Sequence, residues 1–202
     1  MRALSGRLHA DLWVFAYGSL MWDPAIYIAE IRTAALAGFH RAFCLKTHIG
    51  RGSLERPGLM VGLHDGGECQ GLALRIPANI VDRETDIMWM REMVSDGYAP
   101  TFVRVQTPQG TVEALTFVAD KGSSRWVDLD EEATARMIAT GVGMLGTNLD
   151  YLDTLAGHPV LLGVIDIGIS HLHARAHQVV GALAIGPQLP RPSSTLPKRP
   201  SG

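Results

Sequence analysis

The chain has 202 residues, 47% of them hydrophobic and 19% charged, and its formal net charge is −2 at pH 7. A chain of this length can bury a substantial core as one domain, and its charge argues against a nucleic-acid-binding surface or a polybasic membrane anchor. Its two cysteines, Cys44 and Cys69, cannot build a disulfide framework, and no stretch reaches the roughly 20 apolar residues of a membrane span. We therefore expect a cytoplasmic protein, monomeric by default, that binds neither nucleic acid nor membranes.

Short apolar runs bounded by glycine, proline and polar residues predict strands in the first half of the chain and just after its middle. The predicted strands cover residues 12–17, 33–47, 59–63, 70–76, 102–105 and 112–118. The second of these could be one long strand bent around Gly38. The cluster Asp65-Gly66-Gly67 predicts a hairpin turn between the third and the fourth.

Apolar residues at a spacing near 3.6 predict helices elsewhere. The predicted helices cover residues 80–94, 128–138, 148–155 and 166–183. Asp128 and Glu131 have the spacing of a capping box for the second helix. The expected architecture is α+β: a mainly antiparallel sheet that could close on itself, with helices inserted mid-chain and appended at the end.

The proline-rich residues 187–202 lack any hydrophobic periodicity. Such a segment cannot bury enough apolar surface to order itself, so we expect it to be disordered. We accordingly predict a single domain over residues 1–186, with an ordered core at about residues 12–183.

The segment from Ala16 to Trp22 places a Gly-Ser turn between two aromatic residues at the end of a predicted strand. Glycine permits positive φ angles and the close approach of a ligand, and successive backbone N–H groups can bind a carboxylate or a developing oxyanion. The pattern therefore suits a ligand-binding loop. From these residues alone, the segment could also be a tight turn whose two aromatic side chains pack in the core.

A charged pair, Arg91-Glu92, lies in an otherwise apolar part of the predicted helix. On the outer face of that helix both side chains would simply be solvated. Glu92, however, follows Met88 by one turn and is flanked by Trp89 and Met93. Apolar neighbours raise the pKa of a carboxyl group, so Glu92 is a candidate general base.

Asn148 and Tyr151 are three residues apart and therefore share one face of a predicted helix. This spacing could bring two polar groups to one site. The alternative is an asparagine N-cap followed by a core tyrosine.

Three further patterns are weaker. GVGMLG at residues 141–146 matches a dinucleotide fingerprint, but it follows a predicted helix and not a strand, so we expect no nucleotide cofactor. His173 and His177 are spaced i, i+4, with His171 nearby, but the sequence offers no carboxylate partner for them. We interpret them as surface histidines and expect no metal. Cys44 lies in an apolar run, where a buried, inert thiol is usual.

Six segments stand out in order along the chain: VFAYGSLMWDP, GFHRAFCL, RPGLMVGL, GLALRIP, WMREM followed by Gly97-Tyr98, and GTNLDYL. In order and spacing they resemble the ChaC-type, glutathione-specific γ-glutamyl cyclotransferases. The resemblance runs from about Trp13 to Leu162 and fades beyond Leu162. His158-Pro159 is expected to break the helix in which it lies.

The resemblance implies a small mixed, partly closed β-barrel with flanking helices. It also implies a lyase of glutathione catabolism, which cleaves glutathione into 5-oxoproline and Cys-Gly without a cofactor. Glu92 would be the catalytic base, and the YGSL loop would bind the γ-glutamyl moiety. Arg91 and Asn148 would have supporting roles. The expected substrate-binding residues are Ala16, Tyr17, Gly18, Ser19, Leu20, Met21, Tyr98 and Tyr151.

In this reaction the α-amine of the γ-glutamyl group attacks its own γ-carbonyl, so the protein needs no Ser or Cys nucleophile. Two alternatives stay open. One is a cyclotransferase of the same fold that acts on other γ-glutamyl amino acids or amines. The other is a non-catalytic module that binds a γ-glutamyl-like ligand.

Overall fold

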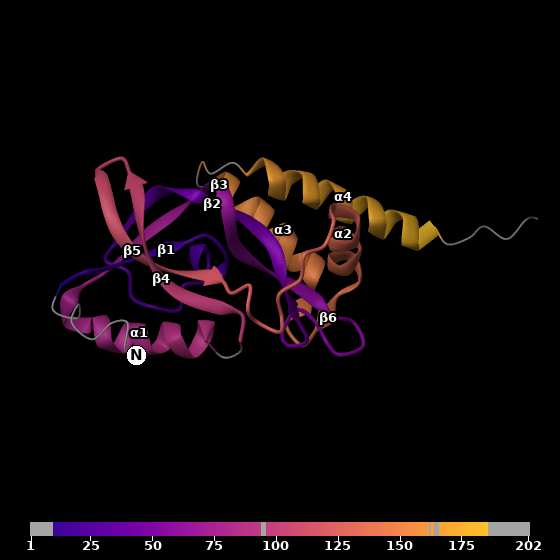
Figure 1. Cartoon of the computed structure of the whole chain (residues 1–202), viewed down its shortest axis with the longest axis horizontal. Coiled ribbons are helices and arrows are strands. Elements are labelled where there is room, and N and C mark those ends of the chain that lie inside the picture. Colours follow the sequence, from indigo (N-terminus) through magenta and orange to yellow (C-terminus); the bar gives the residue numbers. More distant parts are fainter. Residues whose placement is uncertain (1–9, 94–95, 162, 164–165, 186–202) are drawn as a thin grey trace, which may run out of the picture.

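The computed structural model describes residues 10–93, 96–161, 163 and 166–185. Five strands form a closed barrel in the order β1-β3-β2-β4-β5 (Figure 1). Neighbouring strands are antiparallel, except that β1 and β3 each make a short parallel pairing with β5, and the pairing with β1 closes the barrel. The strands are β1 Leu12–Ala16, β2 Glu30–Thr47, β3 Gly58–Ile76, β4 Tyr98–Thr107 and β5 Gly110–Ala119. The predicted α+β class and the β-barrel are therefore confirmed, and the barrel, expected to be partly closed, is closed.

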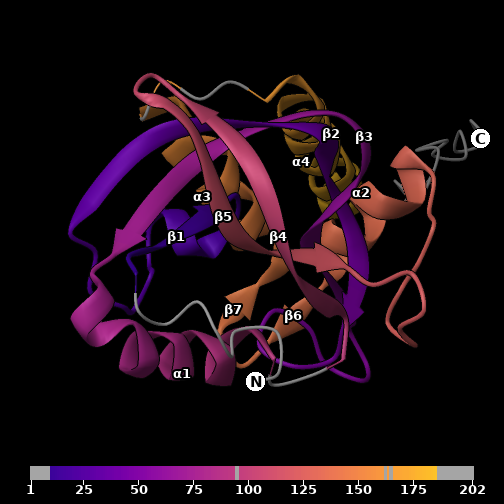
Figure 2. The ribbon, with the colours of Figure 1, turned by 60° about the vertical axis from the view of Figure 1, so that its left-hand side comes forward.

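The remaining elements lie around this barrel. Helix α1 lies along one end of it, whereas α2, α3 and α4 pack together on the outside of the long β2–β3 ribbon (Figure 2). No helix among the residues described is both long and apolar enough to span a bilayer. The α-helices are α1 Val81–Glu92, α2 Glu131–Thr140, α3 Asn148–Leu161 and α4 Ile167–Ile185. Two short 3₁₀ helices are η1 Ser19–Met21 and η2 Ala78–Ile80, and two short strands are β6 Val142–Gly143 and β7 Gly146–Thr147.

Strands β2 and β3, of 18 and 19 residues, pair along almost their whole length and bend together. Gly38 has a φ of 85° at the predicted bend of β2, where the register with β3 shifts. The predicted hairpin at residues 65–67 is wrong, because β3 runs through this cluster without a break. Gly66 and Gly67 have φ angles of 97° and 72°, so they form an irregularity inside a strand that stays paired with β2 on either side.

Two further predictions need correction. The residue that caps α2 is Asp130 and not Asp128, since the Asp130 carboxylate accepts the N–H of Ala133 at 2.7 Å. Helix α3 continues past Pro159 to Leu161. The predicted break at His158-Pro159 is therefore wrong. Residues 187–202, for which disorder is expected, lie outside the described residues.

Asn148 attaches α3 to the barrel. Its side chain is fully buried, its Oδ1 accepts the N–H of Leu59 at 2.7 Å, and its Nδ2 donates to the Leu59 carbonyl at 2.7 Å. The asparagine thus satisfies both backbone groups of one residue of β3. A Cβ at Gly58 would collide with the Arg51 carbonyl oxygen and would meet the Asn148 amide at about 3.0 Å, which explains the glycine there. Asn148 is therefore a structural connection between helix and strand.

We predict that Asn148→Ala lowers the free energy of unfolding by about 2–5 kcal/mol, because it leaves a buried N–H and a buried C=O without partners. Urea denaturation of the purified variants measures this. Asn79→Ala, the same change at an exposed asparagine, is the control and should shift the stability by less than about 1 kcal/mol. Equal losses in the two variants would contradict the structural role of Asn148.

Candidate active site

A cavity of about 290 Å³ opens at one end of the barrel. Its walls come from the η1 loop after β1, the C-terminal end of α1, the connection between β2 and β3, and the β6–β7 hairpin. In Figure 2, α1 and the β6–β7 hairpin, which are far apart in sequence, both lie in the lower part of the view. The predicted residues that line the cavity are Tyr17, Gly18, Ser19, Leu20, Arg91, Glu92, Tyr98 and Tyr151.

Two predicted loop residues lie outside this lining. Ala16 is fully buried as the last residue of β1, and the sulfur of Met21 lies 3.8 Å from Nη2 of Arg41, behind the loop. Gly18 does not use the positive φ angles that glycine permits, since its φ is −125°. A side chain at Gly18 would instead meet Val61 at 3.2 Å and approach the Tyr151 hydroxyl. The glycine therefore leaves space in the cavity.

Arg41, which the sequence analysis assigned no role, anchors this loop. Its buried guanidinium donates to the Tyr17 carbonyl at 2.6 Å and to the Gln70 carbonyl, and it pairs with the Asp166 carboxylate at 2.9 Å. A buried cation is tolerated when its donors are satisfied in this way. In the sequence, the signal for this role was that Arg41 directly precedes the apolar run AFCL.

Arg91 joins the loop to the end of α1. One terminal nitrogen donates to the Ser19 hydroxyl at 3.1 Å, and the other donates to the Asp23 carbonyl. Its Nε lies 3.5 Å from the carboxylate of Glu92. A single side chain therefore fixes the distance between the loop and the candidate base.

Glu92 lines the cavity and has only 16% of its side chain exposed. Burial raises its pKa, and the positive charge of Arg91 only partly opposes this effect. The position of Glu92 as the last residue of α1 acts in the same direction, because the negative end of a helix dipole disfavours a carboxylate. The predicted elevation of the pKa is confirmed.

Glu84, in the same helix, shows that burial alone does not produce this effect. Its carboxylate is almost fully buried, but it accepts the N–H of Tyr27 at 2.9 Å and pairs with Arg83. These hydrogen bonds stabilise the ionised form and lower the pKa of Glu84. Of these two buried carboxylates, only Glu92 faces the cavity with a raised pKa.

Three tyrosines form much of the cavity wall. The Tyr17 hydroxyl donates to the Phe117 carbonyl at 2.6 Å, and the Tyr98 hydroxyl donates to the Val61 carbonyl at 2.7 Å. Tyr151 packs edge-on against Phe43 at the base of α3. Burial raises the pKa of all three hydroxyl groups, so they remain protonated at neutral pH. They can therefore offer oxygen lone pairs to a ligand but cannot act as bases.

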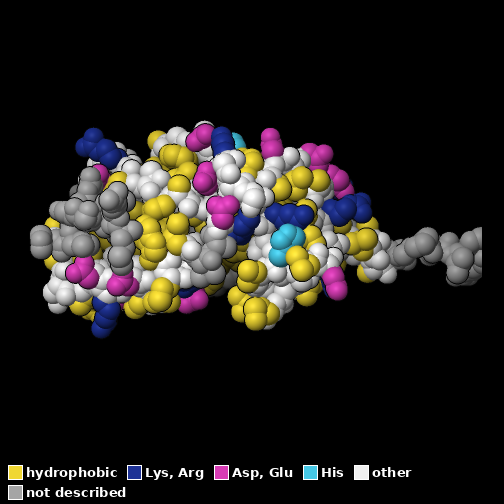
Figure 3. Space-filling model, turned by 60° about the horizontal axis from the view of Figure 1, so that its bottom comes forward, with side chains coloured by type: hydrophobic (Ala, Val, Ile, Leu, Met, Phe, Trp, Pro, Cys, Tyr) yellow, Lys and Arg dark blue, Asp and Glu magenta, His cyan; other side chains and the backbone are white. Residues whose placement is uncertain are grey.

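The sequence analysis also missed the cationic and apolar parts of the wall. Arg51 and Arg125 line the cavity together with Arg91, whereas Glu92 is its acidic residue. Ile49 and Leu145 line it too, although they are 64% and 67% exposed. In Figure 3, which brings the bottom of the view in Figure 1 forward, hydrophobic side chains lie beside Lys and Arg side chains. The pocket can thus receive a small anionic molecule with apolar parts.

The glycine-rich segment at residues 141–146 forms the β6–β7 hairpin beside this pocket. A side chain at Gly143 would collide with the carbonyl oxygens of Gly50 and Gly52. The glycines thus permit close backbone packing, and no βαβ unit surrounds them, so the match to a dinucleotide fingerprint carries no function. Cys44 is likewise inert, since burial raises the pKa of its thiol to about 12.

Comparisons with known proteins identify relatives of this chain. A sequence model of the family described as "ChaC-like protein" matches residues 12–179, which is further than the resemblance to Leu162 suggested. A glutathione-specific gamma-glutamylcyclotransferase of Escherichia coli K12 is 39% identical over 163 residues, which cover 80% of this chain and 71% of that protein. The human glutathione-specific gamma-glutamylcyclotransferase 1 is 33% identical over 160 residues, covering 75% and 71%.

A solved structure supports the fold. The crystal structure of a yeast gamma-glutamyl cyclotransferase specific to glutathione matches with a TM-score of 0.78, covering 84% of this chain and 97% of that one. The two sequences are 18% identical, so this likeness shows a shared fold and no more.

We predict that Glu92→Gln raises the Tm at pH 7.5 and leaves it unchanged near pH 4. The folded-state pKa of Glu92 is raised, so the ionised carboxylate costs stability above that pKa, and the cost disappears once both states are protonated. Thermal unfolding at the two pH values measures the effect. Glu55→Gln, at an exposed glutamate, should leave the Tm unchanged at both. A Tm at pH 7.5 that falls or stays constant in Glu92→Gln would contradict the raised pKa.

Proposed function

The chain belongs to the ChaC-like protein family, and we propose that it cleaves glutathione by γ-glutamyl cyclotransfer into 5-oxoproline and Cys-Gly. The observation that carries the proposal is a buried carboxylate with a raised pKa, Glu92, in the same cavity as the Tyr17–Leu20 loop. The names of the bacterial and human relatives support glutathione as the substrate.

The charges of the cavity suit this substrate. At neutral pH glutathione carries two carboxylates and one α-ammonium group. Three arginines, Arg51, Arg91 and Arg125, line the cavity, and their positive charge attracts the carboxylates, while Glu92 can pair with the ammonium. The volume of about 290 Å³ lies near the lower end of ligand pockets, about 300–1,000 Å³, which suits a tripeptide. This complementarity supports binding in a single orientation.

We propose that Glu92 removes the proton from the α-ammonium group. A free glutamate has a pKa of about 4.3 and an α-amino group one of about 8, so the transfer is unfavourable in water. The burial that raises the pKa of Glu92 narrows this gap. The neutral amine then attacks the γ-carbonyl carbon, and because both groups belong to one folded substrate, the enzyme need only hold them in a reactive geometry.

The loop can stabilise the oxyanion that this attack produces. Ser19 and Leu20 begin the η1 turn, and the first N–H groups of a helical turn have no acceptor within it. Amide donors directed at a developing negative charge lower the barrier. Their position depends on Arg41, which holds the Tyr17 carbonyl, and on Arg91, which holds the Ser19 side chain.

The reaction ends when the bond between the γ-carbon and the cysteine nitrogen breaks. Glu92 returns its proton to the departing nitrogen. The attacking nitrogen must lose a second proton to become the lactam N–H, and this proton also passes to the departing nitrogen, so Cys-Gly leaves with an ammonium group and the glutamyl part leaves as the five-membered lactam. The atoms balance without water or a second substrate.

Two other assignments are less well supported. A cyclotransferase for other γ-glutamyl amino acids would use the same residues, and the substrate test below separates it from the first proposal. A binding module without catalysis would gain nothing from a buried base. Monomeric assembly, a cytoplasmic location and the absence of nucleic-acid and membrane partners remain predictions.

We predict that Glu92→Gln lowers the rate of 5-oxoproline formation from glutathione by at least about 100-fold, because the general base is lost. Mass spectrometry of 5-oxoproline and Cys-Gly measures the rate, and calorimetry should show that the variant still binds glutathione. Glu55→Gln is the matched control and should react at the wild-type rate.

γ-Glutamyl-alanine, offered in parallel, tests the choice of substrate. Turnover of glutathione alone supports the proposal as stated. Turnover of γ-glutamyl-alanine alone would support γ-glutamyl cyclotransfer but reject glutathione as the substrate. No product from either compound would reject the proposed activity. An active Glu92→Gln variant would show that another group is the base.

A further inference from the structure

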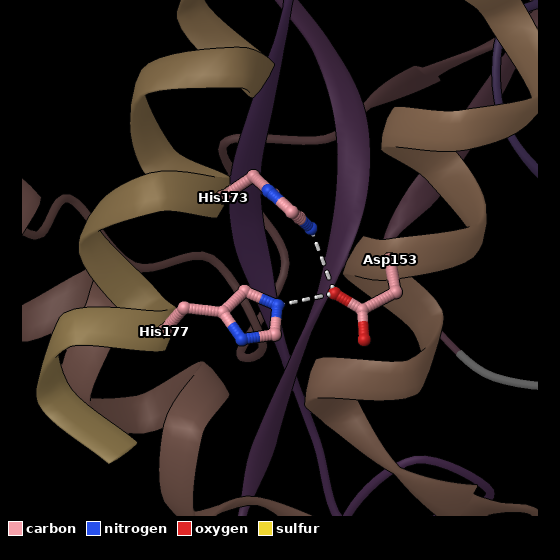
Figure 4. Close-up of side chains that lie close together, drawn as sticks. All are labelled: Asp153, His173 and His177. Carbon is pink, nitrogen blue, oxygen red and sulfur yellow. Dashed lines mark hydrogen bonds and ion pairs between the residues drawn. The ribbon is translucent and has the colours of Figure 1, made fainter. Parts of the chain in front are cut away.

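Three side chains on the far side of α3 from the cavity form a compact cluster. His173 and His177, one turn apart on α4, both direct Nε2 at the same carboxylate oxygen of Asp153 on α3 (Figure 4). The two distances to Oδ1 are 2.8 and 2.7 Å, and the ring centroids of the histidines are 4.6 Å apart. None of the three residues lines the active-site cavity.

The prediction that no carboxylate accompanies these histidines is wrong. Asp153 lies 20 residues before His173 in the sequence, on a different helix, so no local pattern reveals it. The packing of α4 against α3 brings the three side chains together (Figures 1 and 4). Their ligand atoms all lie within 4.8 Å of one another.

We propose that Asp153, His173 and His177 bind one divalent transition-metal ion, of which Zn²⁺ is the best match. Imidazole nitrogens and a carboxylate oxygen are ordinary ligands of zinc, and two histidines at i, i+4 on a helix present their nitrogens to one point. Bonds of about 2.0–2.1 Å in a tetrahedral site place the ligand atoms about 3.4 Å apart. The observed separations therefore need only small side-chain rotations.

The exposure of the cluster agrees with a reachable, open site. The side chains of His173, Asp153 and His177 are 35%, 41% and 46% exposed, so an ion can enter and retain water at the fourth position. One carboxylate oxygen serves two imidazole nitrogens in the present arrangement. A metal ion would replace both hydrogen bonds with direct coordination by the same three groups.

Metal binding at this cluster would connect the two helices that support the active site from outside. Helix α3 carries Tyr151 in the cavity wall, and Asp166, which pairs with Arg41, caps the start of α4 by accepting the N–H of Ile169 at 3.0 Å. A ligand that binds only the folded state stabilises it in proportion to its affinity. A metal ion bound there would therefore have a structural role, since none of its three ligands lines the active-site cavity.

The test uses the full-length chain, purified without a histidine tag and freed of metal by a chelator that is then removed. Titration of Zn²⁺ against a chromophoric chelator should give one bound ion with a dissociation constant below about 10 µM. Co²⁺ should give the intense visible absorption of a tetrahedral complex, and added Zn²⁺ should raise the Tm.

Asp153→Asn and His177→Gln should each weaken Zn²⁺ binding at least about tenfold and abolish the rise in Tm. His171→Gln is the matched control, because this exposed histidine of α4 lies outside the cluster, and it should bind like the wild type. His177→Gln decides the matter if Asp153→Asn fails to fold. A dissociation constant for Zn²⁺ above about 10 µM in the wild type would overturn the proposal, and so would wild-type affinity in His177→Gln. The cluster would then be a hydrogen-bonded contact between two helices.

Discussion

The position of the active-site loop depends on the buried guanidinium of Arg41. An ion removed from water costs several kcal/mol unless all its donors find partners. Here the partners are the carbonyls of Tyr17 and Gln70 and the carboxylate of Asp166. These groups belong to the end of β1, to β3 and to the start of α4, so one cation fixes the loop, the barrel and the C-terminal helices relative to one another.

Glu92 is the opposite case, a buried charge whose environment disfavours ionisation. The nearby Arg91 lies at 3.5 Å and directs two of its nitrogens toward the loop, so it only partly compensates the burial. A carboxylate held in this way is a stronger base than a solvated one, and the fold gives up some stability to keep it. The contrast with Glu84, whose hydrogen bonds lower its pKa, separates a carboxylate that holds the structure from one suited to proton transfer.

Local patterns predicted much of this arrangement. The bend at Gly38 and the raised pKa of Glu92 follow from residues within one turn or a few positions in the chain. Gly66 and Gly67 were misassigned because the same residues suit a hairpin turn and a bulge, and only the pairing of β3 with β2 decides between them. Asp153 could not be assigned at all, since its contacts exist only after α4 packs on α3. The same holds for Arg51 and Arg125 on the cavity wall.

The central claim is that Glu92 deprotonates the attacking α-amine and that the amides of the Tyr17–Leu20 loop stabilise the oxyanion formed by the same attack. A crystal structure of the Glu92→Gln variant with glutathione bound tests this most directly, because the variant should bind the substrate without consuming it. The account predicts the α-amine within about 3 Å of the side chain at position 92, and the γ-carbonyl oxygen within hydrogen-bond distance of the loop amides. Glutathione bound elsewhere, or with its α-amine turned away from residue 92, would contradict the proposed mechanism.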